Sequence, residues 1–172
     1  MIDPDRAQTS GNLAFRIAAA SDADVLVEML YLAVFVGPGT APPPRSIVAQ
    51  PELARYVGGW GRPGDDGVIA ALPTGDPIGA AWLRLWSTDD QGYGFVDVQT
   101  PELSMAVRSE FRGQGIGTLL LRRILDRADC IHESVSLSVS LQNPAVHLYE
   151  KFGFVKLFGD GTSTTMRRMR AR

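Results

Sequence analysis

A strand-like segment that leads into alternating glycines and then into an apolar helical run most limits how this chain can fold. The stretch "RSEFRGQGIGTLLL" covers residues 108–121 and places glycine at 113, 115 and 117. Glycine weakens helices and strands, but it lets the backbone approach an anion because it has no Cβ atom. The first turn of a helix adds unpaired N–H groups and partial positive charge. We interpret the stretch as a strand–turn–helix unit that either cradles a pyrophosphate, with Arg112 adding charge, or is a tight turn without a ligand.

The spacing of the glycines does not match two familiar phosphate-binding fingerprints. A kinase-type P-loop requires Gly-x-x-x-x-Gly-Lys-Ser/Thr, and the lysine is absent here. The dinucleotide fingerprint Gly-x-Gly-x-x-Gly is not met either, because Thr118 stands where the last glycine would be. The next predicted strand ends in "SLQN" (140–143), without the acidic residue that binds the ribose in that fold.

Length and composition describe a single domain without a strong electrostatic preference. The chain has 172 residues, of which 45% are hydrophobic and 21% are charged, and its formal net charge is −2. A chain of this size can bury a sizeable core. Its charge predicts neither nucleic acid nor a membrane surface as a partner. We expect the polar residues 1–12 to be loose and residues 13–172 to form the domain.

The cysteine and histidine content argues against disulfides and metal. Cys130 is the single cysteine, so no intramolecular disulfide can form, which fits a reducing cytoplasm. His132 and His147 show no ligand spacing with Cys130, so we expect no metal site. The first residues lack the basic and apolar regions of a signal peptide, and no apolar run approaches the roughly 20 residues that span a bilayer. We therefore expect a cytoplasmic protein.

Hydrophobic periodicity and turn residues predict an α+β fold, in which the strands form one mixed sheet and helices pack on it. Ser21 is the expected N-cap of the first helix, whose apolar positions run from Val25 to Ala33. The Gly/Pro segment "GPGTAPPPR" (37–45) is expected to be a surface connection. The other expected helices are 51–59, 115–130 and 143–153, and the expected strands are 13–19, 66–72, 78–87, 102–107, 134–140, 154–159 and 163–169.

Two stretches together resemble the GNAT superfamily of N-acetyltransferases. "VRSEFRGQGIGTLLL" (107–121) is similar to its acyl-CoA signature, Arg/Gln-x-x-Gly-x-Gly/Ala, and "NPAVHLYEKFGFV" (143–155) is similar to its following motif, with Asn, Tyr and Gly-Phe at matching spacing. The order of the elements also matches, and the resemblance is weakest at 37–66 and 87–100. It implies one domain with a mostly antiparallel sheet of about six or seven strands, about four helices, and two splayed strands at a cofactor cleft.

The resemblance implies acetyl-CoA as the cosubstrate. Free backbone groups of Met105 and Val107 would pair with its pantetheine arm, and Asn143 would contact the pantetheine or the acetyl end. The pyrophosphate would be held by the backbone N–H groups of Arg112, Gly113, Gln114, Gly115, Ile116 and Gly117, together with Thr118.

Transfer of an acetyl group from a thioester to an amine needs three functional groups. An amine with a pKa of about 10.4 is mostly protonated at neutral pH, so a base must remove a proton. The carbonyl oxygen needs a donor as it gains charge, and a free strand N–H such as that of Val107 suits this role. The departing thiolate needs a proton, and the family commonly places a tyrosine acid at the position of Tyr149. Tyr149 also lies on the apolar stripe of its helix, so we expect it to pack as well.

The base is the least defined of these groups. Glu102 is the only carboxylate on strand 102–107, and many family members carry a glutamate on this strand. Counted back from Val107, it lies one residue from the family's best-known glutamate, which in a regular strand is the opposite face. A β-bulge would restore the face. Glu102 as the base, Glu102 as a solvated carboxylate at the start of the strand, and a water chain without a dedicated base all remain open.

The acetyl acceptor is expected to be a primary amine, most simply that of a small molecule, bound between residues 25–60 and the loop 87–101. A protein lysine or N-terminal amine, a non-catalytic acyl-CoA-binding domain and a structural domain without cofactor are the alternatives. Dimers are common in the superfamily, so we expect a homodimer. The aromatic residues that would line the acceptor site or pack in the core are Trp60, Trp82, Trp86, Tyr93 and Phe95, and the acids that would attract a cation or lie in solvent are Asp89, Asp90 and Asp97.

Overall fold

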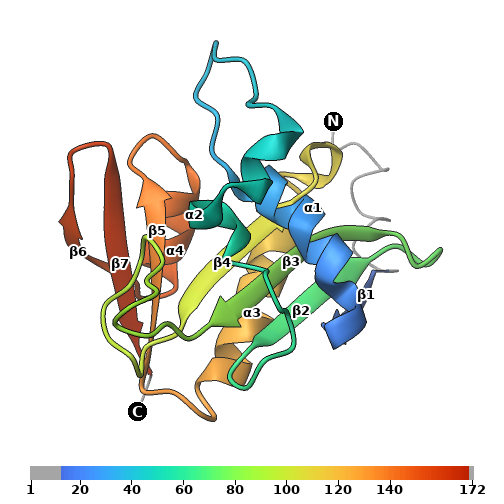
Figure 1. Ribbon diagram of the computed structural model, residues 1–172. Helices are drawn as coiled ribbons and strands as arrows, with labels where there is room; N and C mark the ends of the chain where they lie inside the picture. The colour runs from blue at the N-terminus through green and yellow to red at the C-terminus, as the bar shows by residue number, and fades with distance from the viewer. Residues whose placement is uncertain (1–12, 171–172) are drawn as a thin grey trace.

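The chain forms a seven-stranded sheet with helices on both faces (Figure 1). The computed structural model describes residues 13–170, so the predicted loose segment 1–12 lies outside the described residues. The α+β class and the order of the elements are confirmed. Within the described residues the strands are β1 (Ala14–Ile17), β2 (Asp66–Ala71), β3 (Pro77–Arg84), β4 (Glu102–Val107), β5 (Ser134–Ser140), β6 (Val155–Gly159) and β7 (Ser163–Met169), and the α-helices are α1 (Ala23–Ala33), α2 (Pro51–Ala54), α3 (Ile116–Ala128) and α4 (Ala145–Lys151).

β4 and β5 are parallel neighbours, and they pair at a single position. The strand order is β1-β2-β3-β4-β5-β7-β6, and every other neighbouring pair is antiparallel. Glu102 of β4 pairs with Ser136 of β5. Beyond this pair the two strands diverge, as Figure 1 shows. The mostly antiparallel sheet with two splayed strands is therefore the expected one.

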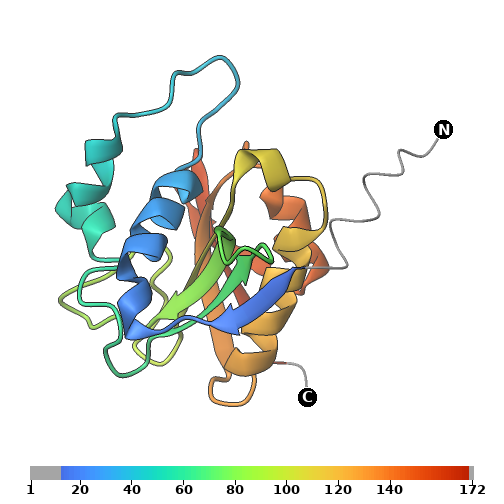
Figure 2. The ribbon, with the colours of Figure 1, turned by 90° about the vertical axis from the view of Figure 1, so that its right-hand side faces the viewer.

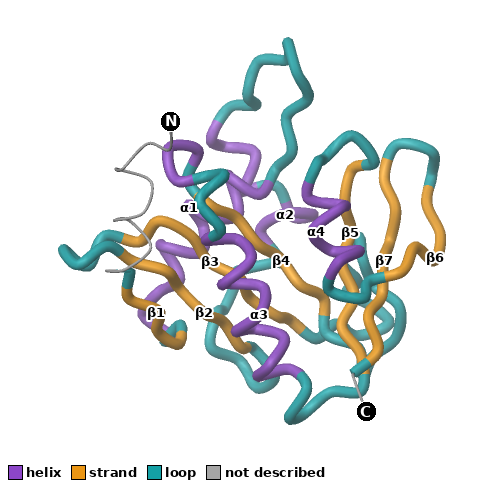
Figure 3. The backbone as a smooth tube through the Cα atoms, turned by 180° about the vertical axis from the view of Figure 1, so that it is seen from behind, coloured by secondary structure: helices purple, strands orange, loops and turns teal. Residues whose placement is uncertain are grey.

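Two hydrophobic cores lie on the two faces of the sheet. Figure 2 shows the helices on both sides of the strands. Leu120, Leu121 and Ile124 of α3 are fully buried against one face, which α4 also covers, and Figure 3 shows these helices in front of the strands. Leu26 and Met29 of α1 pack on the other face, where α2 also lies. Because side chains alternate along a strand, each inner strand contributes to both cores.

The first helix starts one residue later than a Ser21 cap would place it. α1 begins at Ala23, and Asp22 takes the N-cap position. The Asp22 carboxylate accepts the Ala19 N–H at 2.7 Å and both terminal nitrogens of Arg16 at 2.7 Å. The hydrogen bonds from Arg16 lower the pKa of Asp22. The prediction that Ser21 caps this helix is therefore wrong, because the buried carboxylate ties the helix start to β1.

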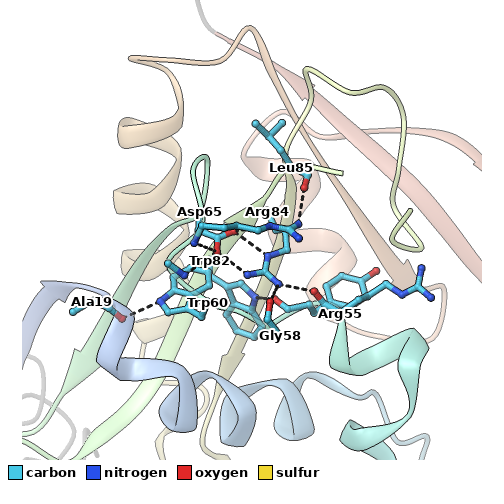
Figure 4. Close-up of polar contacts among 11 residues, drawn as sticks. Ala19, Arg55, Gly58, Trp60, Asp65, Trp82, Arg84 and Leu85 are labelled. Atoms are coloured by element: carbon cyan, nitrogen blue, oxygen red, sulfur yellow. Dashed lines mark hydrogen bonds and ion pairs between the residues drawn. The ribbon is translucent and has the colours of Figure 1, made fainter. Parts of the chain in front are cut away.

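α2 is shorter than the helix expected at 51–59. It ends at Ala54, and the chain continues as turns. Arg84 of β3 donates to the Arg55 carbonyl at 2.6 Å, which in a helix over 51–59 would accept the Gly59 N–H, and it also donates to the Gly58 carbonyl at 2.8 Å (Figure 4). A tertiary contact therefore sets the end of this helix.

A buried ion pair holds the segment after α2 on the sheet. Arg84 and Asp65 each expose 1% of their side chains and are joined at 2.6 and 2.9 Å (Figure 4). Trp82 Nε1 donates to the Tyr56 carbonyl at 3.2 Å from the same strand. Removing one partner of such a pair leaves a buried charge without compensation. These contacts therefore fix the position of Tyr56, which takes part in the site described below.

Residues 13–170 lack both a helix that could cross a membrane and a cluster of possible metal ligands. No helix in this part of the chain is both long and apolar enough to cross a bilayer. The same residues contain no group of three or more His, Cys, Asp or Glu side chains placed to hold a metal ion.

Candidate active site

The glycine stretch turns the chain from β4 into α3. Gly113 and Gly115 have left-handed backbone conformations, with φ of 73° and 80°, and Gly115 is the N-cap of α3. A Cβ atom at either position would meet no other atom within 4 Å. The backbone conformation, and not a lack of space, is therefore the reason for glycine there. Gly117 differs, because its φ is ordinary and a Cβ atom there would lie 3.8 Å from the methyl carbon of Met105, an ordinary van der Waals contact.

The turn leaves a row of backbone donors unused. Within residues 13–170, the N–H groups of residues 114–118 have no hydrogen-bond partner. The Arg112 N–H differs, because it donates to the Ser109 carbonyl at 3.2 Å. Arg112 Nε donates to the Val107 carbonyl at 3.0 Å, which holds the guanidinium beside the turn. Successive free donors at a helix start, with a cation beside them, form a site for an anion.

β4 presents further backbone groups to the gap between β4 and β5. The Ser136 N–H donates to the Pro101 carbonyl at 3.0 Å, whereas the Arg108 N–H donates back to β3 at 2.8 Å. Backbone groups of successive strand residues point in opposite directions. The N–H groups of Met105 and Val107 therefore point into the gap, where an extended ligand can pair with them.

A cavity of about 480 Å³ opens at this gap, and we call it the glycine-turn cavity. Gln114, Gly115 and Thr118 do not line it, although their N–H groups belong to the row of free donors. The other predicted cofactor-binding residues do line it, namely Met105, Val107, Arg112, Gly113, Ile116, Gly117 and Asn143.

Another wall of the glycine-turn cavity comes from the predicted surface connection 37–45 and from the residues just before it. Residues 34–36, Pro42 and Pro43 line the glycine-turn cavity. The Tyr31 hydroxyl donates to the Pro43 carbonyl at 2.9 Å and ties this connection to α1. In Figure 1 the connection rises above the sheet between α1 and α2. The three apolar residues just before the Gly/Pro run were the available signal, since a fully solvated loop does not need them.

A second cavity, of about 410 Å³, adjoins the first, and we call it the Glu102 cavity. The cavities meet at six residues that line both, namely Ala33, Val34, Phe35, Met105, Asn143 and Tyr149. The residues that line only the Glu102 cavity are Leu30, Ile47, Gln50, Glu52, Leu53, Tyr56, Tyr93, Glu102, Leu103, Ser104, Ser138, Val139 and Ser140.

Glu102 lies at the inner end of this second cavity and is 3% exposed. Its carboxylate accepts hydrogen bonds from the Tyr56 hydroxyl at 2.9 Å, from Trp86 Nε1 at 2.7 Å and from the Gly94 N–H at 2.9 Å. Burial raises the pKa of Glu102 to about 7, and the three hydrogen bonds offset only part of this effect. Burial excludes the interpretation of Glu102 as a solvated carboxylate.

β4 reaches this arrangement as a regular strand. β3 and β4 pair without a register shift from Glu102 to Val107. In this regular register Glu102 and Ser104 lie on the same face of β4. The β-bulge considered for the sequence is therefore not present between Glu102 and Val107.

Two glycines bring the loop before β4 onto the carboxylate. A Cβ atom on Gly92 would lie 2.2 Å from Glu102 Oε2, and one on Gly94 would lie 2.6 Å from the Leu137 carbonyl carbon. Both glycines have ordinary φ values, so close approach is what requires them. The Tyr56 hydroxyl also accepts the Tyr93 N–H at 2.7 Å, between these glycines. The segment "GYG" was a readable signal for such a loop, but nothing in it named Glu102 as the partner.

Comparison with protein families identifies the chain. The model of the "Acetyltransferase (GNAT) family" matches residues 38–154, which include the glycine turn, both β4 and β5, and α4. The chain belongs to the GNAT acetyltransferase family. It is therefore an acyl-CoA-dependent N-acetyltransferase by family, and the resemblance expected from the two sequence stretches is confirmed. A comparison with curated proteins finds none that matches this acetyltransferase at significance.

Solved structures share the fold of this acetyltransferase at low sequence identity. A GNAT phosphinothricin acetyltransferase from Sinorhizobium meliloti, in complex with AcCoA, is 22% identical with a TM-score of 0.65 over 92% of this chain and 89% of its own. A spermidine N-acetyltransferase chimera from Vibrio cholerae and hSSAT is 19% identical with a TM-score of 0.59 over 93% and 96%. A GNAT acetyltransferase from Streptococcus pneumoniae is 19% identical with a TM-score of 0.63 over 93% and 100%.

Tyr149 of the acetyltransferase stands where the two cavities meet. Its ring packs edge-on against Phe154, with ring centroids 5.8 Å apart, so the expected packing role is present. Within the described residues its hydroxyl has no hydrogen-bond partner. Burial raises the pKa of Tyr149 to about 12, so the hydroxyl keeps its proton at neutral pH. A buried hydroxyl that faces two cavities can donate to a group bound there.

The aromatic and acidic candidates divide between core and site. Tyr93 lines the Glu102 cavity, whereas the three tryptophans and Phe95 do not. The tryptophans are buried in the α1-side core, and Phe95 packs against it. None of the three loop aspartates lines either cavity: Asp90 pairs with Arg55 at 3.0 Å, and Asp97 Oδ1 accepts the Gln99 N–H at 2.9 Å. The loop aspartates are therefore not placed to attract an acceptor into the cavity.

Proposed function

We propose that this protein transfers the acetyl group of acetyl-CoA to a primary amine of a small molecule, with both substrates bound at once. The observation that carries the proposal is the junction of the two cavities at Met105, Asn143 and Tyr149. One cavity offers free backbone donors and a cation, and the other contains a buried carboxylate. A donor and an acceptor held on the two sides of this junction would meet without an intermediate carrier.

The residues of the glycine-turn cavity fit acetyl-CoA. The free N–H groups of residues 114–118 suit its pyrophosphate, and the Arg112 guanidinium adds positive charge beside them. The N–H groups of Met105 and Val107 suit the amide groups of its pantetheine arm, and that of Val107 suits the carbonyl oxygen as it gains charge. Asn143 Oδ1 accepts the Ala145 N–H at 2.9 Å, which leaves the Asn143 amide NH₂ for a ligand. When bound, acetyl-CoA supplies an activated acetyl group.

Glu102 is our proposal for the proton acceptor. Its pKa of about 7 is closer to that of an amine than the pKa of an ordinary carboxylate, so proton transfer to it is less unfavourable at neutral pH. Oε1 accepts two hydrogen bonds and Oε2 accepts one, so one lone-pair position remains on Oε2. The Tyr56 hydroxyl, bonded to Oε1, lines the same cavity. A proton can reach Glu102 directly or through this hydroxyl.

Tyr149 is our proposal for the proton donor. The transfer forms an amide bond and breaks the thioester C–S bond. A protonated amine loses one proton before it attacks and a second as the amide forms, while the CoA thiolate gains one, so one proton is released overall. The Tyr149 hydroxyl is protonated at neutral pH and faces the junction, so it suits the thiolate. A small-molecule acceptor is favoured because a cavity of about 410 Å³ lies within the range of small-ligand sites. Action in the cytoplasm as a homodimer is part of the same proposal; the first rests on the sequence and the second on the family, in which dimers are common.

Calorimetric titration with acetyl-CoA tests the cofactor half of this proposal. We expect micromolar binding by the wild-type protein and loss of binding by Gly115→Glu, which puts a carboxylate among the free N–H groups. Gly161→Glu is the matched control. Gly161 also has a positive φ, 91°, and open surroundings, but it lies in the turn between β6 and β7. Equal binding by wild type and Gly115→Glu would contradict the assignment of the glycine turn to the pyrophosphate.

A panel of primary amines, with release of the CoA thiol as the readout, tests the chemical half. We expect acetyl-CoA-dependent thiol release with at least one small amine and the acetylated amine in the product by mass spectrometry. Acetyl-CoA binding without transfer to any amine would contradict the catalytic proposal and favour a non-catalytic acyl-CoA-binding domain.

A further inference from the structure

The charged residues that line the Glu102 cavity within the described chain are all acidic. Glu102 lies at its inner end and Glu52, an exposed residue of α2, lies on its wall. Among residues 13–170, no lysine, arginine or histidine lines this cavity. The glycine-turn cavity is the reverse case, because Arg112 lines it and no acidic residue of the described chain does. The two halves of the site therefore favour ligands of opposite charge.

Two arginines that are close in sequence to cavity-lining residues are engaged elsewhere. Arg55, which follows α2, pairs with Asp90 at 3.0 Å and donates to the Gln91 carbonyl at 2.9 Å. Arg45 forms an ion pair with Glu28 of α1. Neither arginine lines the Glu102 cavity. A carboxylate or phosphate on an acceptor would therefore find no cationic partner there and would lie beside carboxylates of like charge.

The remaining polar and aromatic lining suits a cation. The rings of Tyr56 and Tyr93 are stacked, with centroids 6.3 Å apart and planes inclined by 20°, and both tyrosines line the cavity. Tyr93 is 62% exposed, so it offers a ring surface near solvent. Aromatic faces attract ammonium groups and pack against apolar bodies. Ser104 and Ser138 add neutral hydroxyl groups to the wall.

We infer that the acceptor is an amine whose only charges are positive, such as an arylalkylamine or a diamine, and that amines carrying a carboxylate or phosphate are rejected. This inference rests on the proposed acetyl transfer and names the acceptor class for the same site. It follows from the two carboxylates and the absence of lining cations within the described residues. The inference predicts that the protein distinguishes an amine from the amino acid that differs from it only by the α-carboxylate.

Matched pairs that differ only by a carboxylate test this inference. Tyramine is compared with tyrosine, and cadaverine with lysine, on the wild-type protein. kcat/KM comes from thiol release, and Kd comes from calorimetry in the presence of CoA. We expect the carboxylate-free member of at least one pair to be preferred at least tenfold in kcat/KM and in affinity. Equal or better use of the amino acids would overturn the inference and leave the proposed acetyl transfer standing.

Two further outcomes separate the inference from the proposed function. A tenfold preference in binding without any transfer would support the acceptor class and overturn the acetyl transfer. Acetyl transfer confined to the amino acids would overturn the acceptor class alone. If none of the four compounds binds or reacts, the inference is overturned for these classes.

A charge-reversal variant checks the role of the cavity wall. Glu52→Lys places a cation on the wall, and Asp76→Lys makes the same charge change at an exposed turn between β2 and β3 that lines neither cavity. We expect Glu52→Lys to reduce the preference for tyramine over tyrosine at least fivefold, mainly through KM, and Asp76→Lys to leave it unchanged. An unchanged preference in Glu52→Lys would remove Glu52 from the argument and leave Glu102 alone to reject the acid. An equal loss of preference in both variants would overturn the assignment to the cavity wall.

Discussion

The two cavities of the site are built in different ways. The glycine-turn cavity and the turn beside it offer mainly backbone groups, the free N–H groups of residues 114–118 and those of Met105 and Val107, with the Arg112 side chain adding a cation. The Glu102 cavity takes its polar character from side chains, namely Glu102, Tyr56 and the serines of β4 and β5. Backbone N–H groups are present in any sequence that can adopt the turn. Polar side chains, by contrast, require a particular residue at each position.

This difference separates what a family shares from what one member does. The glycine turn depends on a local conformation, φ near 73° and 80°, that a short run of residues determines. The Glu102 cavity depends on α2, on the loop with Gly92 and Gly94, and on two strands brought together over long sequence distances. A shared cofactor can be read from the first cavity, and the choice of acceptor has to be read from the second.

The largest expected effect comes from breaking the second cavity alone. In Gly94→Ala the new Cβ atom would lie 2.6 Å from the Leu137 carbonyl carbon and 2.7 Å from the Ser138 nitrogen, so the loop must move away from Glu102. We expect kcat/KM for the amine to fall by about 100-fold and stability to fall by about 1–3 kcal/mol. Calorimetry should find acetyl-CoA binding nearly unchanged. A loss of acetyl-CoA binding equal to the loss of activity would show that the cavities are not independent.

Tyr149→Phe changes a residue at the junction of the two cavities, where Tyr149 lines both. It removes the hydroxyl and keeps the ring that packs on Phe154. We expect kcat to fall by about 100-fold, while the Kd values for acetyl-CoA and amine stay within about twofold. Steady-state kinetics and calorimetry measure the two effects separately. Wild-type kcat in this variant would reduce Tyr149 to a packing residue.

The pH profile sharpens the role of the Glu102 cavity. Burial raises the pKa of Glu102 to about 7, so the carboxylate is increasingly protonated below that pH. A base must be deprotonated to act, and kcat/KM should therefore fall as the pH drops below about 7. Glu102→Gln should lower kcat/KM and remove this limb of the profile. A wild-type profile without this limb would favour a water chain over Glu102.

Tyr56→Phe tests Glu102 by a smaller change, the loss of one of its three hydrogen bonds. The hydrogen bond from the Tyr56 hydroxyl lowers the pKa of Glu102, so its loss should raise that pKa and move the acid limb to higher pH. One hydrogen bond contributes about 1 kcal/mol, so at a pH on the acid limb of the profile we expect kcat/KM to fall about fivefold. A shift to lower pH would contradict the sign of this contact.

The smallest expected effect is on the glycine turn itself. Gly113→Ala meets no atom within 4 Å, so its cost is the left-handed conformation alone. We expect about 1 kcal/mol of lost stability, a fall in Tm of about 2–4 °C, and severalfold weaker acetyl-CoA binding. Thermal denaturation and calorimetry check this. A much larger loss of affinity with the same Tm would mean that the ligand approaches the Gly113 Cα directly.

Much of the fold follows from local patterns. The strict alternation of β5 and the strand-forming run of β4 predicted both strands with their observed ends, because a period of two is a short-range property. The end of α2 and the cap of α1 were missed, since Arg84 and Asp22 act there through contacts with other segments. Such contacts override local propensity at helix ends.

The sequence by itself determined the family, the glycine turn and the position of Tyr149, because short motifs impose local backbone geometry and spacing. Only the tertiary structure decided the setting of Glu102. Its burial, its three hydrogen-bond donors and its raised pKa depend on residues 56, 86 and 94, which are brought to it by packing. The charge of the Glu102 cavity also depends on the tertiary structure, because residues from separate segments line it. Desolvation and proximity are properties of three-dimensional neighbours, and no local pattern along the chain encodes them.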